Sequence, residues 1–174
     1  MGSGPHTGSW RTETPAIHVS DAIHVNATWH ELLLVCWRQS PTLAALDDVH
    51  EATRRLLVAH PEGVGVLGIA QSGMPMIGAA ERGRAADLLK DFGKKMRCLA
   101  SVIEGEGFWA GTTRSVMTAI TLMARPPCPT RIFSTVSDAA GWMAPSLGAP
   151  ATSALSIERA VVAMRRQADS SPPA

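Results

Sequence analysis

Residues 31–70, ELLLVCWRQSPTLAALDDVHEATRRLLVAHPEGVGVLGIA, decide the fold of this chain. The apolar run in ELLLVCWR (31–38) predicts a strand that is covered on both faces, and VGVLGIA (64–70) predicts a second buried strand. Between them, Ser40 can cap a helix and Pro41 suits its first position, and apolar residues then recur at helical spacing. Strand, helix and strand in this order predict a parallel pair.

The same alternation continues toward Leu147. A short strand at 23–28 should pair with 31–38 as an antiparallel hairpin. We expect an α/β fold: a single domain with a mostly parallel central sheet, an N-terminal antiparallel hairpin strand and flanking helices. The later expected elements are a helix at 77–92, a strand at 97–103, a helix at 108–124, a strand at 130–134 and a helix through 139–143 that follows a capping box at Thr135 to Asp138.

The domain boundaries follow from composition. Gly, Ser, Thr and Pro dominate the start of the chain, and such segments bury too little apolar surface to offset their ordering entropy. The expected organisation is a disordered arm at 1–16, the α/β domain at 17–148, a linker at 149–153, a C-terminal amphipathic helix at 154–166 and a disordered tail at 167–174.

Charge and cysteine content bound the partners and the compartment. The 174 residues carry a formal net charge of +1, with scattered basic residues, so we expect no nucleic-acid partner. Three cysteines are too few for a disulfide framework and indicate reduced thiols in a cytoplasmic protein. No apolar stretch is long enough for a membrane span, and we find no signal peptide.

The carboxyl ends of the expected parallel strands form the candidate functional surface, because ligands of open α/β sheets gather there. Glu104 and Glu106 could act as an acid/base pair, although acidic residues are also favoured at a helix N-terminus. The residues expected to form this ligand- or partner-binding surface are Gln71, Ser72, Glu104, Glu106, Phe108 and Trp109.

Two segments resemble the STAS domain family, the anti-sigma-factor-antagonist fold, and its SpoIIAA-like branch in particular. RIFSTVSDAAGWM (131–143) is similar to that branch's final strand and helix, and ELLLVCWRQSPTLAALDDV (31–49) to its second strand and first helix. In signalling members a phosphorylated serine lies in an Asp-Ser-Ser-Gly-like turn. The resemblance implies that Ser72, followed by Gly73, is a possible phosphosite, but the preceding Asp is absent; we therefore favour the interpretation that Ser72 is a helix cap.

Other catalytic arrangements have little support in the sequence. A Ser72 hydrolase needs a base, and all six histidines lie at or before His60, so we expect no catalytic residues. His18, His24 and His30 recur every six residues without a cysteine or carboxylate at zinc spacing, so we expect no metal. Two acids in the loop 104–107 argue against a phosphate loop, and no cofactor is expected.

The hypothesis is therefore a non-enzymatic, cytoplasmic regulatory or protein-interaction module of the STAS-like type. The alternative is a carrier for a small apolar or lipid-like ligand held between the sheet and helix 108–124, as CRAL-TRIO-type relatives of the branch imply; a weaker alternative is an enzyme that uses Glu104 or Glu106. Eight methionines suggest an adaptable pocket, although Met117, Met123 and Met143 are individually expected in the core. Trp142, Met143 and the C-terminal helix offer apolar surface for a homodimer.

Overall fold

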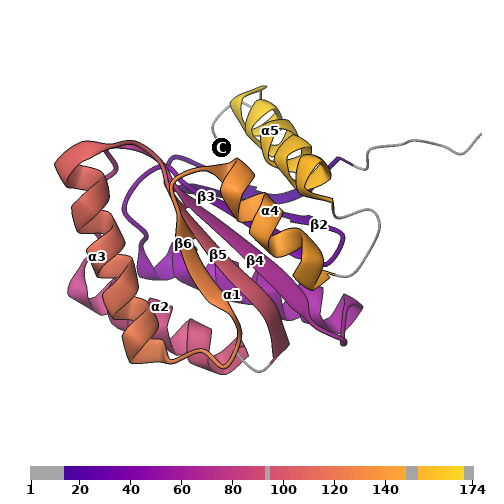
Figure 1. Cartoon of the computed structure of the whole chain (residues 1–174), viewed down its shortest axis with the longest axis horizontal. Coiled ribbons are helices and arrows are strands. Elements are labelled where there is room, and N and C mark those ends of the chain that lie inside the picture. The colour runs from indigo at the N-terminus through magenta and orange to yellow at the C-terminus, as the bar shows by residue number, and fades with distance from the viewer. Residues whose placement is uncertain (1–13, 93–94, 148–152, 171–174) are drawn as a thin grey trace, which may run out of the picture.

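A six-stranded mixed sheet lies at the centre of the molecule, with helices on both faces (Figure 1). The computed structural model describes residues 14–92, 95–147 and 153–170. The predicted α/β fold is confirmed. The strands are β1 (Ala16–Ser20), β2 (His24–Trp29), β3 (Leu32–Trp37), β4 (Val64–Ala70), β5 (Met96–Ile103) and β6 (Thr130–Phe133).

The strands lie in the sheet in the order in which they occur in the chain. β1, β2 and β3 are antiparallel, and β3 to β6 are parallel, so that Leu34 pairs with Leu67 and Leu67 with Ala100. Because successive right-handed crossovers in one direction place their helices on one side, α1 (Leu43–Ala59), α2 (Ala79–Phe92) and α3 (Gly107–Ala124) share a face. α4 (Val136–Leu147) and α5 (Ala154–Ser170) cover the other face.

The first strand is a correction to the sequence prediction, which left residues up to 16 in a disordered arm and expected two strands before the first helix. Ala16–Ser20 forms β1 and pairs with β2, with Ile17 opposite Ala27. β1 is a half-exposed edge strand with a register shift between Ile17 and Val19, so its apolar alternation is short. Its order comes from hydrogen bonding to β2, which local sequence does not reveal.

Helix ends differ from the prediction in three places. The cap of α1 is Thr42, which accepts from the Ala45 amide at 3.1 Å, rather than Ser40. α2 begins at Ala79, two residues after the predicted start. α5 continues to Ser170, beyond the predicted end at 166, because Ala168 is still buried against the core. One half of the capping box of α4 is confirmed, since the Asp138 backbone amide donates to Thr135 Oγ1 at 3.1 Å; the Asp138 carboxylate accepts from the Thr135 hydroxyl at 2.7 Å.

Several predicted segments lie outside the described residues. These are most of the arm (1–13), most of the linker (149–152) and the end of the tail (171–174). None of the described helices is both long enough and apolar enough to cross a lipid bilayer.

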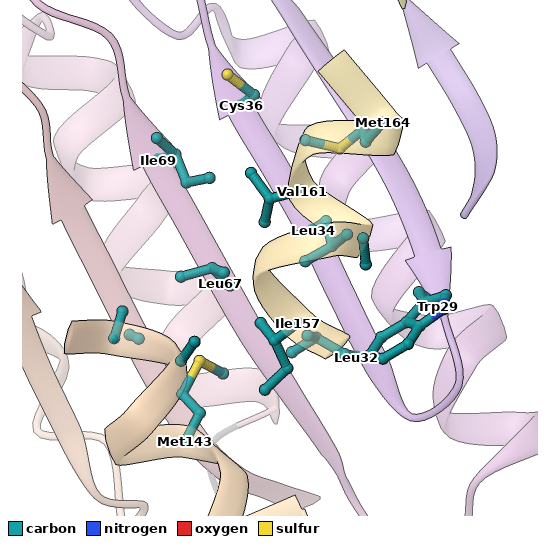
Figure 2. Close-up of a cluster of buried hydrophobic side chains, with 14 of the residues drawn as sticks. Trp29, Leu32, Leu34, Cys36, Leu67, Ile69, Met143, Ile157, Val161 and Met164 are labelled. Atoms are coloured by element: carbon teal, nitrogen blue, oxygen red, sulfur yellow. The ribbon is translucent and has the colours of Figure 1, made fainter. Parts of the chain in front are cut away.

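The sheet face beneath α4 and α5, here called the packed face, carries one continuous hydrophobic cluster (Figure 2). Alternate residues of β3 and β4, such as Leu34 and Leu67, meet Met143 of α4 and Val161 of α5 there, and all four are at most 2% exposed. Met143 is therefore core, as predicted. The dimer prediction relied on Trp142, Met143 and the last helix, but α5 covers this apolar surface within one chain, with Trp142 packed on the same cluster.

The opposite sheet face, here called the cavity face, is organised differently. Its buried residues form three separate clusters between the sheet and α1, α2 and α3. α2 packs mainly against α1 and α3 rather than on the sheet. The core is thus continuous on one side of the sheet and interrupted on the other.

Candidate functional site

A cavity of about 160 Å³ occupies the space between the cavity face and helices α1, α2 and α3. Its lining draws on all three clusters of this side, for example Val66 of the first, Ile103 of the second and Ile120 of the third. The cavity is therefore the gap that divides the core. Apolar side chains form nearly all of its surface.

Small residues form the centre of the cavity floor. The parallel register places Val35, Gly68 and Ser101 side by side on β3, β4 and β5, and all three line the cavity. A Cβ atom built on Gly68 would have no heavy atom within 4 Å, so the space above this residue is open. Because Gly68 has no side chain and Ser101 has a small one, space remains at this point between the sheet and the helices that cover it.

One helix contributes each wall. α1 provides Val49 and His50, α2 provides Leu88 and Phe92, and α3 provides residues that include Met117. The carrier alternative placed a ligand between the sheet and the helix at 108–124, and α3 is that wall. Of the three methionines expected in the core, Met117 lines the cavity, Met143 is buried in the packed face, and Met123 is 57% exposed, which corrects its prediction. Met123 lies near the C-terminal end of α3, where its side of the helix has no neighbour.

The loop 71–78 between β4 and α2 covers the end of the cavity at the carboxyl edge of the sheet. Residues Met74 to Ile77 line the cavity. Trp109 Nε1 of α3 donates to the Met74 carbonyl at 2.8 Å, and Ser40 Oγ donates to the Met76 carbonyl at 3.2 Å. The loop is thus attached to the segments before α1 and along α3, and Met76, at 40% exposed, lies between cavity and solvent.

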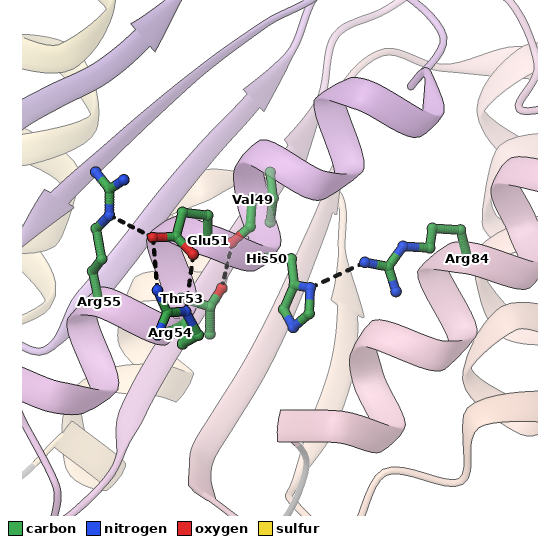
Figure 3. A network of polar contacts seen from close by, with 7 residues as sticks. All are labelled: Val49, His50, Glu51, Thr53, Arg54, Arg55 and Arg84. Atoms are coloured by element: carbon green, nitrogen blue, oxygen red, sulfur yellow. Dashed lines mark hydrogen bonds and ion pairs between the residues drawn. The ribbon is translucent and has the colours of Figure 1, made fainter.

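A polar network joins the α1 and α2 walls (Figure 3). Arg84 of α2 donates to Asp47 Oδ1 at 2.7 Å and to His50 Nδ1 at 3.0 Å. Because a guanidinium group has only donors, Nδ1 must accept, which places the proton of a neutral ring on Nε2. The His50 ring also meets the edge of Phe92 at a centroid distance of 4.7 Å. These contacts fix the spacing of two walls.

The second part of the network lies on the outer side of α1. Glu51 accepts hydrogen bonds from Arg54 and Arg55, and these bonds lower the pKa of Glu51 to about 2. All three side chains are at least 40% exposed, so these pairs are solvent-screened surface contacts. We assign them no role in the site.

Few polar groups reach the cavity. Thr53 Oγ1 donates to the Val49 carbonyl at 2.7 Å and Thr113 Oγ1 to the Trp109 carbonyl at 2.9 Å, so both hydroxyls are satisfied within their own helices. Ser101 is 7% exposed, and its hydroxyl has no hydrogen-bond partner among the described residues. In the described part of the chain, no Asp, Glu, Lys or Arg side chain lines the cavity. The cavity is thus suited to uncharged molecules.

The carboxyl edge predicted from sequence is partly assembled. The two loops after β4 and β5 meet there, because a Cβ atom on Gly105 would collide with the Ser72 side chain. Gly105 has φ +92°, a conformation that glycine tolerates best. The backbone amide of Gln71 donates to the Trp37 carbonyl at 3.1 Å, which fixes the start of the loop 71–78. The loops after β4 and β5 therefore lie together at the carboxyl edge, as the sequence predicted.

Glu104 and Glu106 differ in their surroundings. Glu104 Oε1 accepts from Arg165 Nη2 of α5 at 2.8 Å, so its side chain is engaged with the packed face. Glu106 is the exposed N-cap residue of α3 and makes no side-chain capping bond. The two carboxylates therefore have different partners, and this geometry does not support the acid/base pair considered above.

Ser72 is exposed in the turn after β4, seven residues before α2 begins at Ala79. Ser72 is therefore not a helix cap, and the prediction that it caps the helix after β4 is wrong. The loop 71–78 is longer than the sequence suggested, because its apolar residues face the cavity instead of continuing the helix.

The two aromatic residues of the predicted surface have opposite positions. Phe108 is 91% exposed at the first turn of α3. Trp109 is half-buried, packs in the cluster with Ala70 and Ile103, and holds the loop 71–78 through its indole N–H. Only Phe108 is available to a partner, whereas Trp109 stabilises the cavity cover.

The three cysteines are free and buried. Burial raises the pKa of the Cys36 thiol and raises that of Cys98 to about 12. A raised pKa suppresses the thiolate, which is the nucleophilic form. Among the described residues no group of three or more His, Cys, Asp and Glu side chains is arranged to hold a metal ion.

Sequence reasoning offered a pocket beside helix 108–124 only as an alternative and did not predict its floor at Gly68 and Ser101 or its cover by the loop 71–78. The available signals were Gly68 inside a buried strand and the methionines at 74, 76 and 117, since glycine in a strand often marks open space or a close approach. Comparisons of the chain with protein-family models, with curated proteins and with solved structures gave no match.

Proposed function

We propose that this protein binds a small apolar molecule in the cavity of the cavity face and acts as a carrier or sensor for it. One observation supports the proposal above all: the apolar cavity of about 160 Å³ that divides the core on one side of the sheet. Binding of an apolar molecule would remove the apolar lining from water, and this favours occupation.

The volume favours a small ligand. An engineered protein cavity of about 150 Å³ lined by Leu, Ile and Phe binds benzene. A single ring or a short branched chain therefore matches the space better than a long acyl chain, which narrows the earlier lipid-like alternative. Met74, Met76 and Met117 around the cavity can adjust their flexible side chains to different shapes.

The loop 71–78 is the proposed route of access. It covers the cavity with residues Met74 to Ile77, of which Met76 is exposed on the outside. Hydrogen bonds from Ser40, Trp109 and Arg82 hold its residues 74–77, and the backbone amide of Gln71 fixes its start, so access requires that the bonds to Met74 and Met76 open locally.

Native mass spectrometry of freshly purified protein tests this proposal. We expect a retained apolar molecule or, if purification removes it, binding of toluene detected by NMR titration. Gly68→Val should abolish both, because the new side chain enters the open space above the floor. Gly111→Val is the matched control: Gly111 is exposed on α3, so binding should persist. Wild-type protein that neither retains an apolar molecule nor binds toluene would contradict the proposal.

A regulatory interaction module is the second candidate, and the observation that favours it is Phe108. An aromatic side chain that is 91% exposed at the carboxyl edge, near the Ser72–Gly105 contact, is suited to a protein partner. The resemblance to the STAS family supports the same role, with the free cysteines favouring a cytoplasmic setting. Ser72→Asp and Ser72→Ala should then differ in partner binding at equal stability; equal binding by both and by wild type would exclude the phosphoswitch.

We propose no reaction for Glu104 or Glu106. Glu104 is engaged by Arg165, and Glu106 lies exposed at the start of α3.

A further inference from the structure

We infer that the ligand of this cavity is an uncharged aromatic or short aliphatic molecule with one hydroxyl group, which forms a hydrogen bond with Ser101. This inference rests on the proposed function, because it names the chemical class that the same cavity selects. The observations that carry it are the position of Ser101, the open space beside it and the nature of the remaining lining.

Ser101 has no hydrogen-bond partner among the described residues although it is only 7% exposed. The other buried hydroxyls near the cavity, on Thr53 and Thr113, donate to the carbonyl four residues earlier in their helices. A strand serine lacks that option, because the carbonyl groups of a central strand bond to the neighbouring strands. Ser101 Oγ is not among the fully enclosed polar atoms without a partner in the described chain; it lies at the lining of the cavity, where a bound molecule can reach it.

The neighbour of Ser101 leaves its hydroxyl uncovered. Gly68 pairs with Ser101 across β4 and β5, and nothing lies within 4 Å of the place where its Cβ would be. A larger residue at 68 would fill the space beside the hydroxyl. Ser101 is therefore the polar group of the cavity floor, while His50, Thr53 and Thr113 belong to the helical walls. A few polar groups in an apolar lining orient ligands in small-molecule sites.

The lining excludes charged ligands. In the described part of the chain, the cavity surface has no carboxylate, ammonium or guanidinium group, and Arg84 lies behind His50 with its donors directed to Asp47 and His50. An ion in such a cavity would lack a counter-charge, at a large desolvation cost. A single hydroxyl group on the ligand needs only one partner, and Ser101 can either donate to it or accept from it.

A pair of probes of nearly equal shape tests the inference: phenol, which carries the hydroxyl, and toluene, which does not. NMR titration gives the affinity of each for wild type and for Ser101→Ala. We expect Ser101→Ala to weaken phenol binding about five- to tenfold and to leave toluene binding unchanged, since one neutral hydrogen bond is lost. Thr121→Val is the control, because its hydroxyl is used within α3 and Thr121 does not line the cavity, and it should not change the ratio of the two affinities.

Thermal unfolding of the ligand-free proteins gives a second measurement. Ser101→Ala should be at least as stable as wild type, because the substitution removes a buried hydroxyl that has no partner within the described chain. Clear destabilisation would show that the hydroxyl serves the fold and would overturn the inference. Equal affinity changes for phenol and toluene would overturn it too, while leaving the proposed function intact; failure of both probes to bind wild type would instead contradict the proposed function.

Discussion

The two faces of the sheet are built from alternate residues of the same strands, yet they differ in what they do. On the packed face, one cluster joins the sheet to α4 and α5 without interruption (Figure 2). On the cavity face, three clusters surround an open space. Two glycines of β4 summarise the contrast: a Cβ on Gly65 would lie 2.6 Å from Leu147 Cδ2, whereas one on Gly68 would meet nothing within 4 Å.

Buried polar side chains follow the same division. Of the six buried polar residues in the described chain, five lie on the cavity side, namely His24, Asn26, Thr53, Ser101 and Thr113, and the sixth, Glu31, directly precedes β3. On the packed side, buried polar atoms belong to Arg165 and Gln167 of α5. Stability and binding place opposite demands on a core, because a well-filled interior has no room for a ligand. In this fold the packed face supplies a filled core, and the cavity face leaves space for a ligand.

The largest expected effect compares a leucine from each face. Leu67→Ala should lower the free energy of unfolding by about 4 kcal/mol, because it removes a fully buried side chain from a filled cluster. Leu99→Ala should cost about 2 kcal/mol, since Leu99 already borders the cavity and has fewer contacts to lose. Urea denaturation measures both, and equal losses would show that the two faces are equally well packed.

The glycines give the next effect, of opposite sign on the two faces. Gly65→Ala should destabilise by about 2 kcal/mol, because its methyl group forces Leu147 out of its position in the packed cluster. Gly68→Ala should stabilise by about 0.5 kcal/mol, because alanine loses less backbone entropy in a strand and meets no neighbour.

Both glycine variants are compared in the ligand-free protein, since a bound molecule would add its own stabilisation. Destabilisation by Gly68→Ala as large as that by Gly65→Ala would contradict an open cavity floor. The same strand and the same added methyl group make the pair its own control.

The fold was predictable where strands and helices alternate over long apolar patterns, as in β3, α1 and β4. Such patterns need no knowledge of distant residues. β1 was missed because it is a short edge strand ordered by β2, and the end of α5 was missed because burial of Ala168 depends on the sheet beneath it. Both errors concern contacts between segments rather than local preference.

The candidate site was predictable only in part. The carboxyl ends of parallel strands had to share one edge, and the loops at Ser72 and Gly105 do meet. The partner of Glu104 could not be foreseen, because Arg165 is 61 residues away. The cavity was harder to predict, because it depends on the absent side chain of Gly68, on the small one of Ser101 and on how far from the sheet the three helices pack.

Removal of the ion pair between Glu104 and Arg165, at the rim of the packed face, should change the free energy of unfolding less than Gly65→Ala does. Glu104→Gln keeps the shape but removes the charge that Arg165 meets at 2.8 Å, and both side chains are about one-third exposed. We expect a loss of about 1 kcal/mol, reduced further at high salt because solvent screens part of the attraction. Arg54→Ala, which removes a more exposed pair with Glu51, should cost less. A larger loss for Arg54→Ala would show that α5 is not held by this contact.

The smallest expected effect is a dependence of stability on pH that arises at the edge of the cavity side. His24 is fully buried, its ring stacks on Trp37 at 5.1 Å, and burial lowers its pKa despite the opposing attraction of Asp21. The unfolded chain therefore takes up a proton at a higher pH than the folded one. Stability is retained above the ordinary histidine pKa of about 6.5 and falls as the pH drops below it. Between pH 7.5 and pH 5.5 the free energy of unfolding, measured by denaturation, should decrease less for His24→Phe, which keeps a ring on Trp37, than for wild type. Identical decreases would assign the acid sensitivity to other groups. His18 is then the next residue to substitute, because burial also lowers its pKa.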